Sequence, residues 1–158
     1  MMTILAIDPG NTESGYAVIE MPEFRLLKFG KLENNMLLHF LPVLIGASDH
    51  FAIEMVASYG MPVGKDVFET CVWIGRFIQS ARLEHHFVYR KDEKSCLCCD
   101  SRAKDSNIRQ ALINRYAKFD FKNGKGTKKN PDTFYGVSKD AWQAIAVGVT
   151  YYEMKGSE

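Results

Sequence analysis

The feature that most constrains this chain is a carboxylate at the end of its first apolar run. Residues 3–7, Thr-Ile-Leu-Ala-Ile, lead directly into Asp8, and a turn segment containing Gly10 and Gly15 follows. Glycine lets the backbone bend sharply and lets a ligand approach closely. Because a core strand rarely ends on a carboxylate without a partner, we expect Asp8 to meet a metal ion, a cation or a phosphate-bound ion.

The composition is typical of a soluble globular protein. The 158 residues, 46% hydrophobic and 25% charged, suffice for one domain with a proper core but not for two large lobes. The longest apolar segment, residues 36–47, is too short to span a bilayer, and no signal-like segment follows the first residues. We therefore expect a cytoplasmic protein with a single domain over residues 1–158 and no membrane association.

The order of the predicted elements indicates an α/β fold. The predicted strands cover residues 3–8, 15–20, 24–31, 51–54 and 87–89. The predicted helices cover residues 34–45 with Asn34 or Asn35 as the cap, 65–84, 103–116, and 139–152 after a Ser138 cap, and the loop 119–132 is expected to be mobile. The first three strands form an antiparallel meander, and crossover helices make the later strands parallel. We expect a mixed five-stranded sheet flanked by helices.

The long helix predicted at residues 65–84 has an unusually wide apolar surface. Its apolar face comprises Val67, Cys71, Ile74, Ile78 and Ala81, widened by Phe68, Val72 and Leu83. Two interpretations remain open: contact with a second subunit, or a helix enclosed within one domain.

The cysteines do not have the spacing of a zinc site. Cys96, Cys98 and Cys99 are closer together than a C-x-x-C pair, and no second pair or later histidine accompanies them. Cys71 falls in the apolar helical pattern. We interpret all four as reduced structural cysteines.

Two further carboxylates are expected to join Asp8. Glu54 ends the fourth strand, and Asp140 lies in the first turn of the last helix, where the helix dipole favours an ionised carboxylate. A face of small residues lets this helix pack closely on the sheet and brings Asp140 inward; it comprises Ala141, Ala144, Ile145 and Gly148. Taken singly, each acid also has an ordinary interpretation, as a turn residue, a strand end or a first-turn helix residue.

As a set, the three acids predict a metal site. Carboxylates that converge at one sheet edge repel one another unless divalent cations separate them. Ligands that are all oxygen suit Mg²⁺ or Mn²⁺. Two such ions about 4 Å apart activate water and stabilise the leaving oxygen in phosphodiester hydrolysis.

A basic segment predicts contact with a phosphate backbone. Residues 101–129 contain nine Lys and Arg against two Asp, a net charge of +7, whereas the rest of the chain is negative. Such a segment binds DNA with an affinity that falls steeply with salt, and the alternative is a solvated lysine-rich loop. Nothing in it reads bases, so we expect recognition of branch shape. The DNA contacts predicted in this segment are Arg102, Lys104, Arg109, Lys122, Lys125, Lys128 and Lys129.

Four segments together resemble a known family. They are residues 6–15 (AIDPGNTESG), 52–56 (AIEMV), 103–112 (AKDSNIRQAL) and 138–146 (SKDAWQAIA). They are similar to the RuvC-type Holliday junction endonucleases of the ribonuclease H-like superfamily, above all to the small bacteriophage versions. The resemblance implies a ribonuclease H-like fold and a homodimer that cuts four-way junctions or forks, in the host cytoplasm if phage-encoded. It also implies Mg²⁺ or Mn²⁺ held by Asp8, Glu54 and Asp140 as the catalytic residues.

The chain departs from the family's pattern at two positions. The family usually has a fourth acid one helical turn before the last aspartate, where this chain has Val137, and Asp132 in the preceding loop is the candidate substitute. Family members often place an aromatic residue three positions after the strand-end glutamate, where this chain has Ala57. Tyr59 is then the candidate for stacking on an exposed base.

Lysines near the predicted site complete the resemblance. Lys104 resembles the family's lysine near the scissile phosphate, and Lys94 is a second candidate.

Two other functions fit parts of the sequence. Actin-like sugar kinases and ATPases share an aspartate-glycine turn after their first strand, but they need two lobes to enclose a nucleotide. A protein that binds branched DNA without cutting it would retain the basic segment, and Val137 keeps this alternative open.

Overall fold

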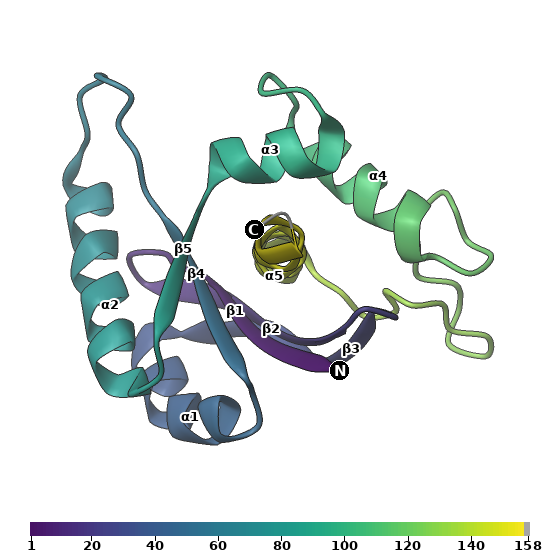
Figure 1. Ribbon diagram of the computed structural model, residues 1–158, viewed down its shortest axis with the longest axis horizontal. Helices are drawn as coiled ribbons and strands as arrows, with labels where there is room; N and C mark the ends of the chain where they lie inside the picture. Colours follow the sequence, from purple (N-terminus) through teal and green to yellow (C-terminus); the bar gives the residue numbers. More distant parts are fainter. Residues whose placement is uncertain (157–158) are drawn as a thin grey trace.

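A mixed five-stranded sheet forms the centre of the fold (Figure 1). The computed structural model describes residues 1–156. The strands are β1 (Met2–Asp8), β2 (Glu13–Met21), β3 (Arg25–Glu33), β4 (His50–Met55) and β5 (His85–Tyr89), in the spatial order β3-β2-β1-β4-β5. β1 pairs with β2 and β2 with β3 antiparallel, whereas β1, β4 and β5 are parallel. The predicted mixed sheet is confirmed.

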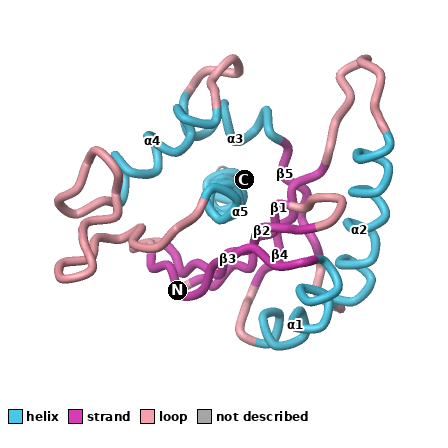
Figure 2. The backbone as a smooth tube through the Cα atoms, turned by 180° about the vertical axis from the view of Figure 1, so that it is seen from behind, coloured by secondary structure: helices cyan, strands magenta, loops and turns pink. Residues whose placement is uncertain are grey.

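Five helices surround the sheet in an asymmetric arrangement. They are α1 (Asn34–Gly46), α2 (Lys65–Ala81), α3 (Arg90–Cys98), α4 (Asp105–Tyr116) and α5 (Lys139–Gly156). α1 and α2 cover one face of the sheet; α5 lies on the other, and α3 and α4 cover α5 (Figures 1 and 2). In the described part of the chain, residues 1–156, no helix combines the length and the apolar character needed to cross a membrane.

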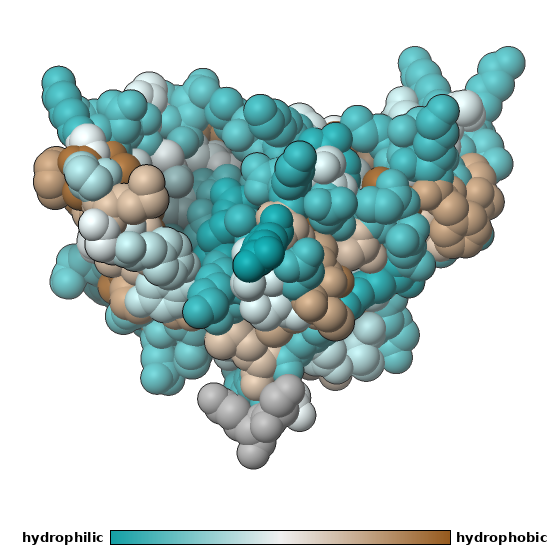
Figure 3. Space-filling model, turned by 90° about the horizontal axis from the view of Figure 1, so that it is seen from above, coloured by the Kyte–Doolittle hydropathy of each residue, from teal (hydrophilic) through white to brown (hydrophobic). Residues whose placement is uncertain are grey.

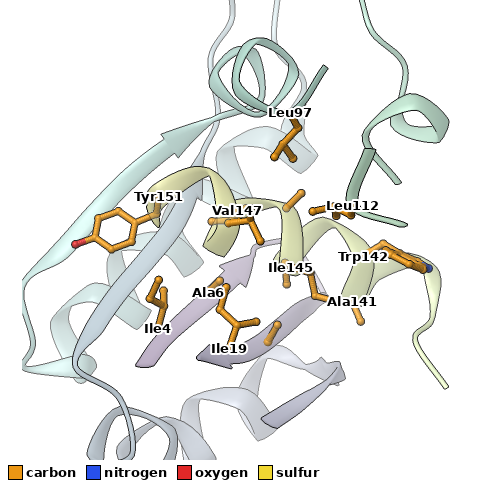
Figure 4. Packing of buried hydrophobic residues seen from close by; sticks show 14 of the residues in the cluster. Ile4, Ala6, Ile19, Leu97, Leu112, Ala141, Trp142, Ile145, Val147 and Tyr151 are labelled. Carbon is orange, nitrogen blue, oxygen red and sulfur yellow. The ribbon is translucent and has the colours of Figure 1, made fainter. Parts of the chain in front are cut away.

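The apolar residues of the sheet form two cores, one on each face. Leu5, Ile7 and Val18 pack with the buried leucines of α1 and with α2. On the other face, Ala6 and Ile19 contact α5, and Leu97 and Leu112 close that core from α3 and α4 (Figure 4). The predicted small-residue face of α5 is buried, and a Cβ atom at Gly148 would lie only 2.8 Å from Ile19 Cδ1. α5 therefore packs against the sheet as closely as the sequence predicted.

Some local predictions are wrong, and each error has a physical reason. α1 is capped by Glu33, whose carboxylate accepts the Asn35 N–H, rather than by Asn34 or Asn35. α2 ends at Ala81, earlier than predicted, because Arg82 adopts a left-handed conformation (φ 53°). α3 was not predicted at all, since its charged sequence buries only Glu93 and Leu97.

The buried face of α2 also differs from the prediction. Its buried residues are Thr70, Ile74, Phe77 and Ala81. Cys71 is only half-buried, and Phe68 and Val72 are 61% and 62% exposed. The enclosed-helix interpretation therefore does not account for the apolar width of α2.

Candidate active site

Strand register brings the three predicted acids to one edge of the sheet. Asp8 lies opposite Gly15 in the β1–β2 ladder. Ile7 is beside Ile53 in the parallel β1–β4 ladder, so the next residue of β4, Glu54, lies beside Asp8. Gly15 in turn packs against the first turn of α5, where an added Cβ would lie 2.4 Å from the Asp140 carbonyl oxygen. The three segments that carry these carboxylates therefore meet at one edge of the sheet.

The turn after Asp8 is held by a buried asparagine. Asn34, which is fully buried, donates from Nδ2 to the Gly10 carbonyl over 2.9 Å and accepts the Ser14 hydroxyl at Oδ1 over 2.6 Å. The Ser14 hydroxyl in turn accepts the Gly10 N–H. The side chain predicted as a helix cap thus fixes the shape of the turn between β1 and β2.

Replacing Gly15 with alanine should destabilise the protein by displacing the α5 turn that carries Asp140. The new methyl group would meet backbone atoms, which cannot move aside as a flexible side chain can. Overpacking of this kind costs roughly 1–3 kcal/mol, so we expect the melting temperature to fall by about 3–10 °C. The control is Gly75→Ala in α2, where nothing lies within 4 Å of the new Cβ and helix propensity predicts a gain of about 0.5–1 kcal/mol. Equal effects of the two variants would contradict the close contact at Gly15.

Burial and neighbouring carboxyl groups raise the pKa values of two of the acids. Burial, the negative charge of Glu54 and hydrogen bonding with it raise the pKa of Asp8 to about 8. Burial and the contact with the Glu93 carboxyl raise the pKa of Glu54 to about 9. Burial also raises the pKa of Glu93. Perturbations of this size concentrate at functional sites.

Arg90 and Glu93 are site residues that the sequence analysis missed. The Arg90 guanidinium lies 3.2 Å from Glu54 Oε1 and 2.9 Å from Asp105 Oδ1, and it also contacts Gln143. Both residues lie on α3, which follows β5 without a loop and so begins beside the end of β4. In the sequence, Arg90 and Glu93 belong to a run of charged residues that is typical of a solvated surface. No motif or spacing in that run marks either residue as part of a site.

Asp140 has a cation of its own. Lys31 Nζ on β3 lies 2.9 Å from Asp140 Oδ2 and 3.0 Å from Glu13 Oε2. Hydrogen bonds to these two carboxylates raise the pKa of Lys31 to about 12. Lys31 is a further residue that the sequence analysis did not single out.

The donor atoms of the site fit a hard divalent cation, although they do not enclose one as arranged. Glu54 Oε1 and both Glu93 carboxylate oxygens are buried without a hydrogen-bond partner among the described residues. Nowhere in residues 1–156 are three or more His, Cys, Asp or Glu side chains already grouped to hold a metal ion. Asp140 is turned toward Lys31 and Glu54 toward Arg90. Oxygen ligands suit Mg²⁺ or Mn²⁺, and binding would require these two side chains to exchange partners.

Two predicted DNA contacts lie beside this site. Tyr59 is 65% exposed on the β4–α2 loop and lines a groove of about 310 Å³ with Lys94, Arg90, Lys91 and Ser101. Arg90 belongs both to this groove and to the ion-pair network of Glu54, so the groove leads to the carboxylates.

The other predicted contacts spread over α4 and the following loop. Arg109, Lys122 and Lys125 line a cleft of about 500 Å³ that also includes Trp142 of α5, two residues beyond Asp140. Arg102 and Lys104 are exposed on the turn before α4, and Lys128 and Lys129 are exposed at a loop tip. Arg115, another member of the basic segment, instead pairs with Glu153 and donates to the Cys96 carbonyl.

The position where the family has its fourth acid is buried in the core, and Asp132, the one candidate substitute, is engaged elsewhere. Val137 is 1% exposed and packs in the core with Phe134 and Trp142. Asp132 accepts backbone N–H groups of Lys118, Phe119, Asp120 and Thr133. These bonds hold the pKa of Asp132 well below its usual range. Asp132 therefore organises the 118–134 loop and is not free to replace the missing ligand.

The same loop is hydrogen-bonded throughout, contrary to the mobility expected from sequence. Asp120 accepts the N–H groups of Asn123, Lys125 and Gly126, and Gly126 bridges Pro131. Its glycines and asparagines thus serve a defined turn structure.

The raised carboxyl pKa values predict that stability falls as the pH rises. The unfolded chain releases the protons of Asp8 and Glu54 near pH 4, but the folded protein retains them to about pH 8 and 9. The folded state then binds more protons, so the free energy of unfolding falls between about pH 4 and 9, by at least about 2 kcal/mol. Thermal denaturation in chelator between about pH 5 and 9 measures this slope. Asp8→Asn should flatten it, and an equal slope in the variant would contradict the assignment.

The fold is that of RuvC. Thermus thermophilus RuvC in complex with a Holliday junction substrate matches with a TM-score of 0.68 and 13% identity over 99% of this chain and 98% of that chain. A second structure of Thermus thermophilus RuvC matches with a TM-score of 0.65 and 15% identity over 98% and 97%. A Fowlpox virus resolvase in complex with substrate Holliday junction DNA has a TM-score of 0.47 and 14% identity over 98% and 99%. No family model and no curated protein sequence matches the chain. Over nearly its whole length, the chain therefore has the RuvC-type, ribonuclease H-like fold that its motifs predict.

Proposed function

We propose that this protein is a metal-dependent, structure-specific endonuclease that hydrolyses phosphodiester bonds in Holliday junctions and other branched DNA. The observation that carries the proposal is that Asp8, Glu54 and the first turn of α5 with Asp140 meet at one edge of a RuvC-type sheet, where Asp8 and Glu54 are half-buried. A protein of this kind would act in the cytoplasm, which is that of the bacterial host if a phage encodes it.

Asp8, Glu54 and Asp140 would hold Mg²⁺ or Mn²⁺, and we propose two ions per site. Bound there, the ions would supply an activated water and charge stabilisation of the leaving oxygen. Asp8 and Glu54 would release their protons on binding, because a cation favours the ionised carboxylate. Asp140 would exchange Lys31 for the metal, which leaves Lys31 with Glu13.

The surface around the site suits branched DNA better than a sequence-specific target. The groove lined by Tyr59 and Lys94 offers one aromatic ring for stacking and cations for phosphate. Arg102 and Lys104 lie on the turn before α4, and the cleft of Arg109, Lys122 and Lys125 continues the basic surface to the lysines at 128 and 129. Contacts of this type position a phosphate backbone without reading bases.

Exposed apolar residues on α1 and α2 support a homodimer. Phe40 and Val43 on α1 are 43% and 64% exposed, and Phe68 and Val72 are exposed on α2. The two helices pack against each other. By contrast, the face seen from above, on the side away from α1, is mostly hydrophilic, with apolar side chains gathered toward its two sides (Figure 3). Apolar patches of this kind mark protein–protein contacts, and two symmetric sites would suit a junction with two strands to cut.

Cleavage of synthetic four-way junctions decides the function. The protein is incubated with end-labelled junctions, forks and linear duplex in Mg²⁺, in Mn²⁺ and in chelator. We expect nicks in the junction with at least one metal, none in chelator and little cleavage of the duplex. Junction binding without nicks in either metal would identify a branched-DNA-binding protein instead. Tight binding of ATP without junction binding would favour the kinase-like alternative.

A further inference from the structure

We propose that Glu93 supplies the fourth carboxylate of the metal site, from α3 rather than from α5. This inference rests on the proposed function. Glu93 is 0% exposed, and neither of its carboxylate oxygens has a hydrogen-bond partner in the part of the chain that the structure describes. A buried carboxyl without a donor is costly unless something compensates its charge. The side chain lies against Glu54, so its unpartnered oxygens belong to the same carboxylate cluster.

A purely structural role as an arginine partner does not explain Glu93. Arg90 Nε is 4.0 Å from Glu93 Oε2, at the limit of an ion pair. The same guanidinium is closer to Glu54 and to Asp105, at 3.2 and 2.9 Å. Arg90 is therefore satisfied without Glu93, whereas the close neighbour of the Glu93 carboxyl is another acid, Glu54, which cannot neutralise it.

The position of α3 makes the substitution possible. The turn before α5 has Val137 in the core, so a carboxylate cannot enter from that side without burial among aromatic rings. α3 starts one residue after the β4–β5 ladder ends at Met55 and Tyr89, and Glu93 lies in its first turn. The Asp92 carboxylate, which accepts the Tyr89 N–H over 2.9 Å, fixes this turn. Glu93 is thus held on a rigid element beside Glu54.

In this arrangement Arg90 compensates the charge of the glutamates while no metal ion is bound. It balances the charges of Glu54 and Glu93, and it can keep Asp105 and Gln143 as partners when a divalent cation takes the two glutamates. Glu93 would then act as a metal ligand next to Glu54 and would provide the negative charge that Val137 cannot.

Divalent-ion affinity of a Glu93→Gln variant tests the inference without relying on activity. Mn²⁺ binding is measured by calorimetry and by the loss of the free-ion electron paramagnetic resonance signal. We expect the affinity to fall by about tenfold or more, since losing even an outer-shell partner of a metal ligand typically costs about 10- to 100-fold. The melting temperature in chelator should stay equal or rise, because the variant removes an uncompensated buried acid.

Glu153→Gln is the matched control. It makes the same substitution at a glutamate that pairs with an arginine, Arg115, but on α5 outside the carboxylate cluster, and we expect Mn²⁺ affinity to change by no more than about twofold. Equal affinities of Glu93→Gln and the wild type would overturn the role of Glu93 and leave the proposed function intact if junctions are still cut. A wild-type protein that binds no Mn²⁺ and cuts no junction would overturn both.

A measurement on the unaltered protein covers the case in which the variant does not fold. With ¹³C-labelled glutamate carboxyls, titration with Mg²⁺ should shift two buried glutamate signals, those of Glu54 and Glu93. A shift of one buried signal alone would contradict the inference.

Discussion

Asp8→Asn is expected to reduce junction cleavage by a factor on the order of 10³ or more while junction affinity changes by less than about threefold. Asparagine has nearly the same shape but cannot provide the negative charge that a divalent ion requires. The substitution leaves the β1–β2 and β1–β4 ladders intact, since these involve only backbone atoms. The groove and the basic surface that would bind DNA do not include Asp8. The Asp8→Asn variant should therefore lose cleavage and keep junction binding.

Single-turnover cleavage and a gel-shift titration of the same junction measure the two effects. The control is Asp66→Asn, because the Asp66 carboxylate accepts Asn11 Nδ2 over 3.3 Å next to the same turn but is exposed on α2. This control should cut junctions at the wild-type rate. If Asp8→Asn loses binding and cleavage together, or melts at a much lower temperature, Asp8 has a structural role and the catalytic assignment is wrong.

The sheet and the meeting of the three segments that carry the acids could be predicted from the sequence because both follow from local rules. Strand alternation and turn residues define β1 to β3, and parallel crossovers place the ends of β1 and β4 at the same edge. The small residues of α5 predict the close approach that carries Asp140 inward, and Gly15 is its counterpart on β2. None of these inferences requires knowledge of a long-range side-chain contact.

The residues that the sequence analysis missed depend on such contacts. Glu93 and Arg90 acquire their roles because α3 continues directly from β5, and a charged nine-residue helix has no apolar period to reveal it. Lys31 reaches Asp140 only because β3 pairs beside β2. Asp132 was a candidate ligand by its proximity to α5 in the sequence, but backbone N–H groups of its own loop occupy its carboxylate. Residue type and spacing alone do not distinguish these cases.

The loop tip with Lys128 and Lys129 gives the second large expected effect. The Thr127 N–H donates to the Asn130 carbonyl over 3.0 Å, and the Asn130 N–H donates to the Thr127 carbonyl over 3.1 Å. The two lysines between them therefore occupy the centre of a tight turn. Asp120 and Asp132 brace the base of this turn. The double variant Lys128→Glu with Lys129→Glu should therefore keep its fold. We expect junction affinity to fall by about 10- to 100-fold at moderate salt, with a dependence of log affinity on log salt that is shallower by about two.

Binding titrations between about 50 and 200 mM salt measure both quantities. The matched control is Lys28→Glu with Lys155→Glu, which makes the same change in net charge at exposed residues outside the 101–129 segment. The two double variants have the same net charge, so any effect of net charge is equal in both. If the lysines at the turn contact phosphates, only the variant at Lys128 and Lys129 changes the salt slope, because that slope counts the ions released at local contacts. Equal slopes in the two double variants would remove the turn from the DNA interface. The DNA would then have to approach through the Tyr59 groove and the Arg109 cleft alone.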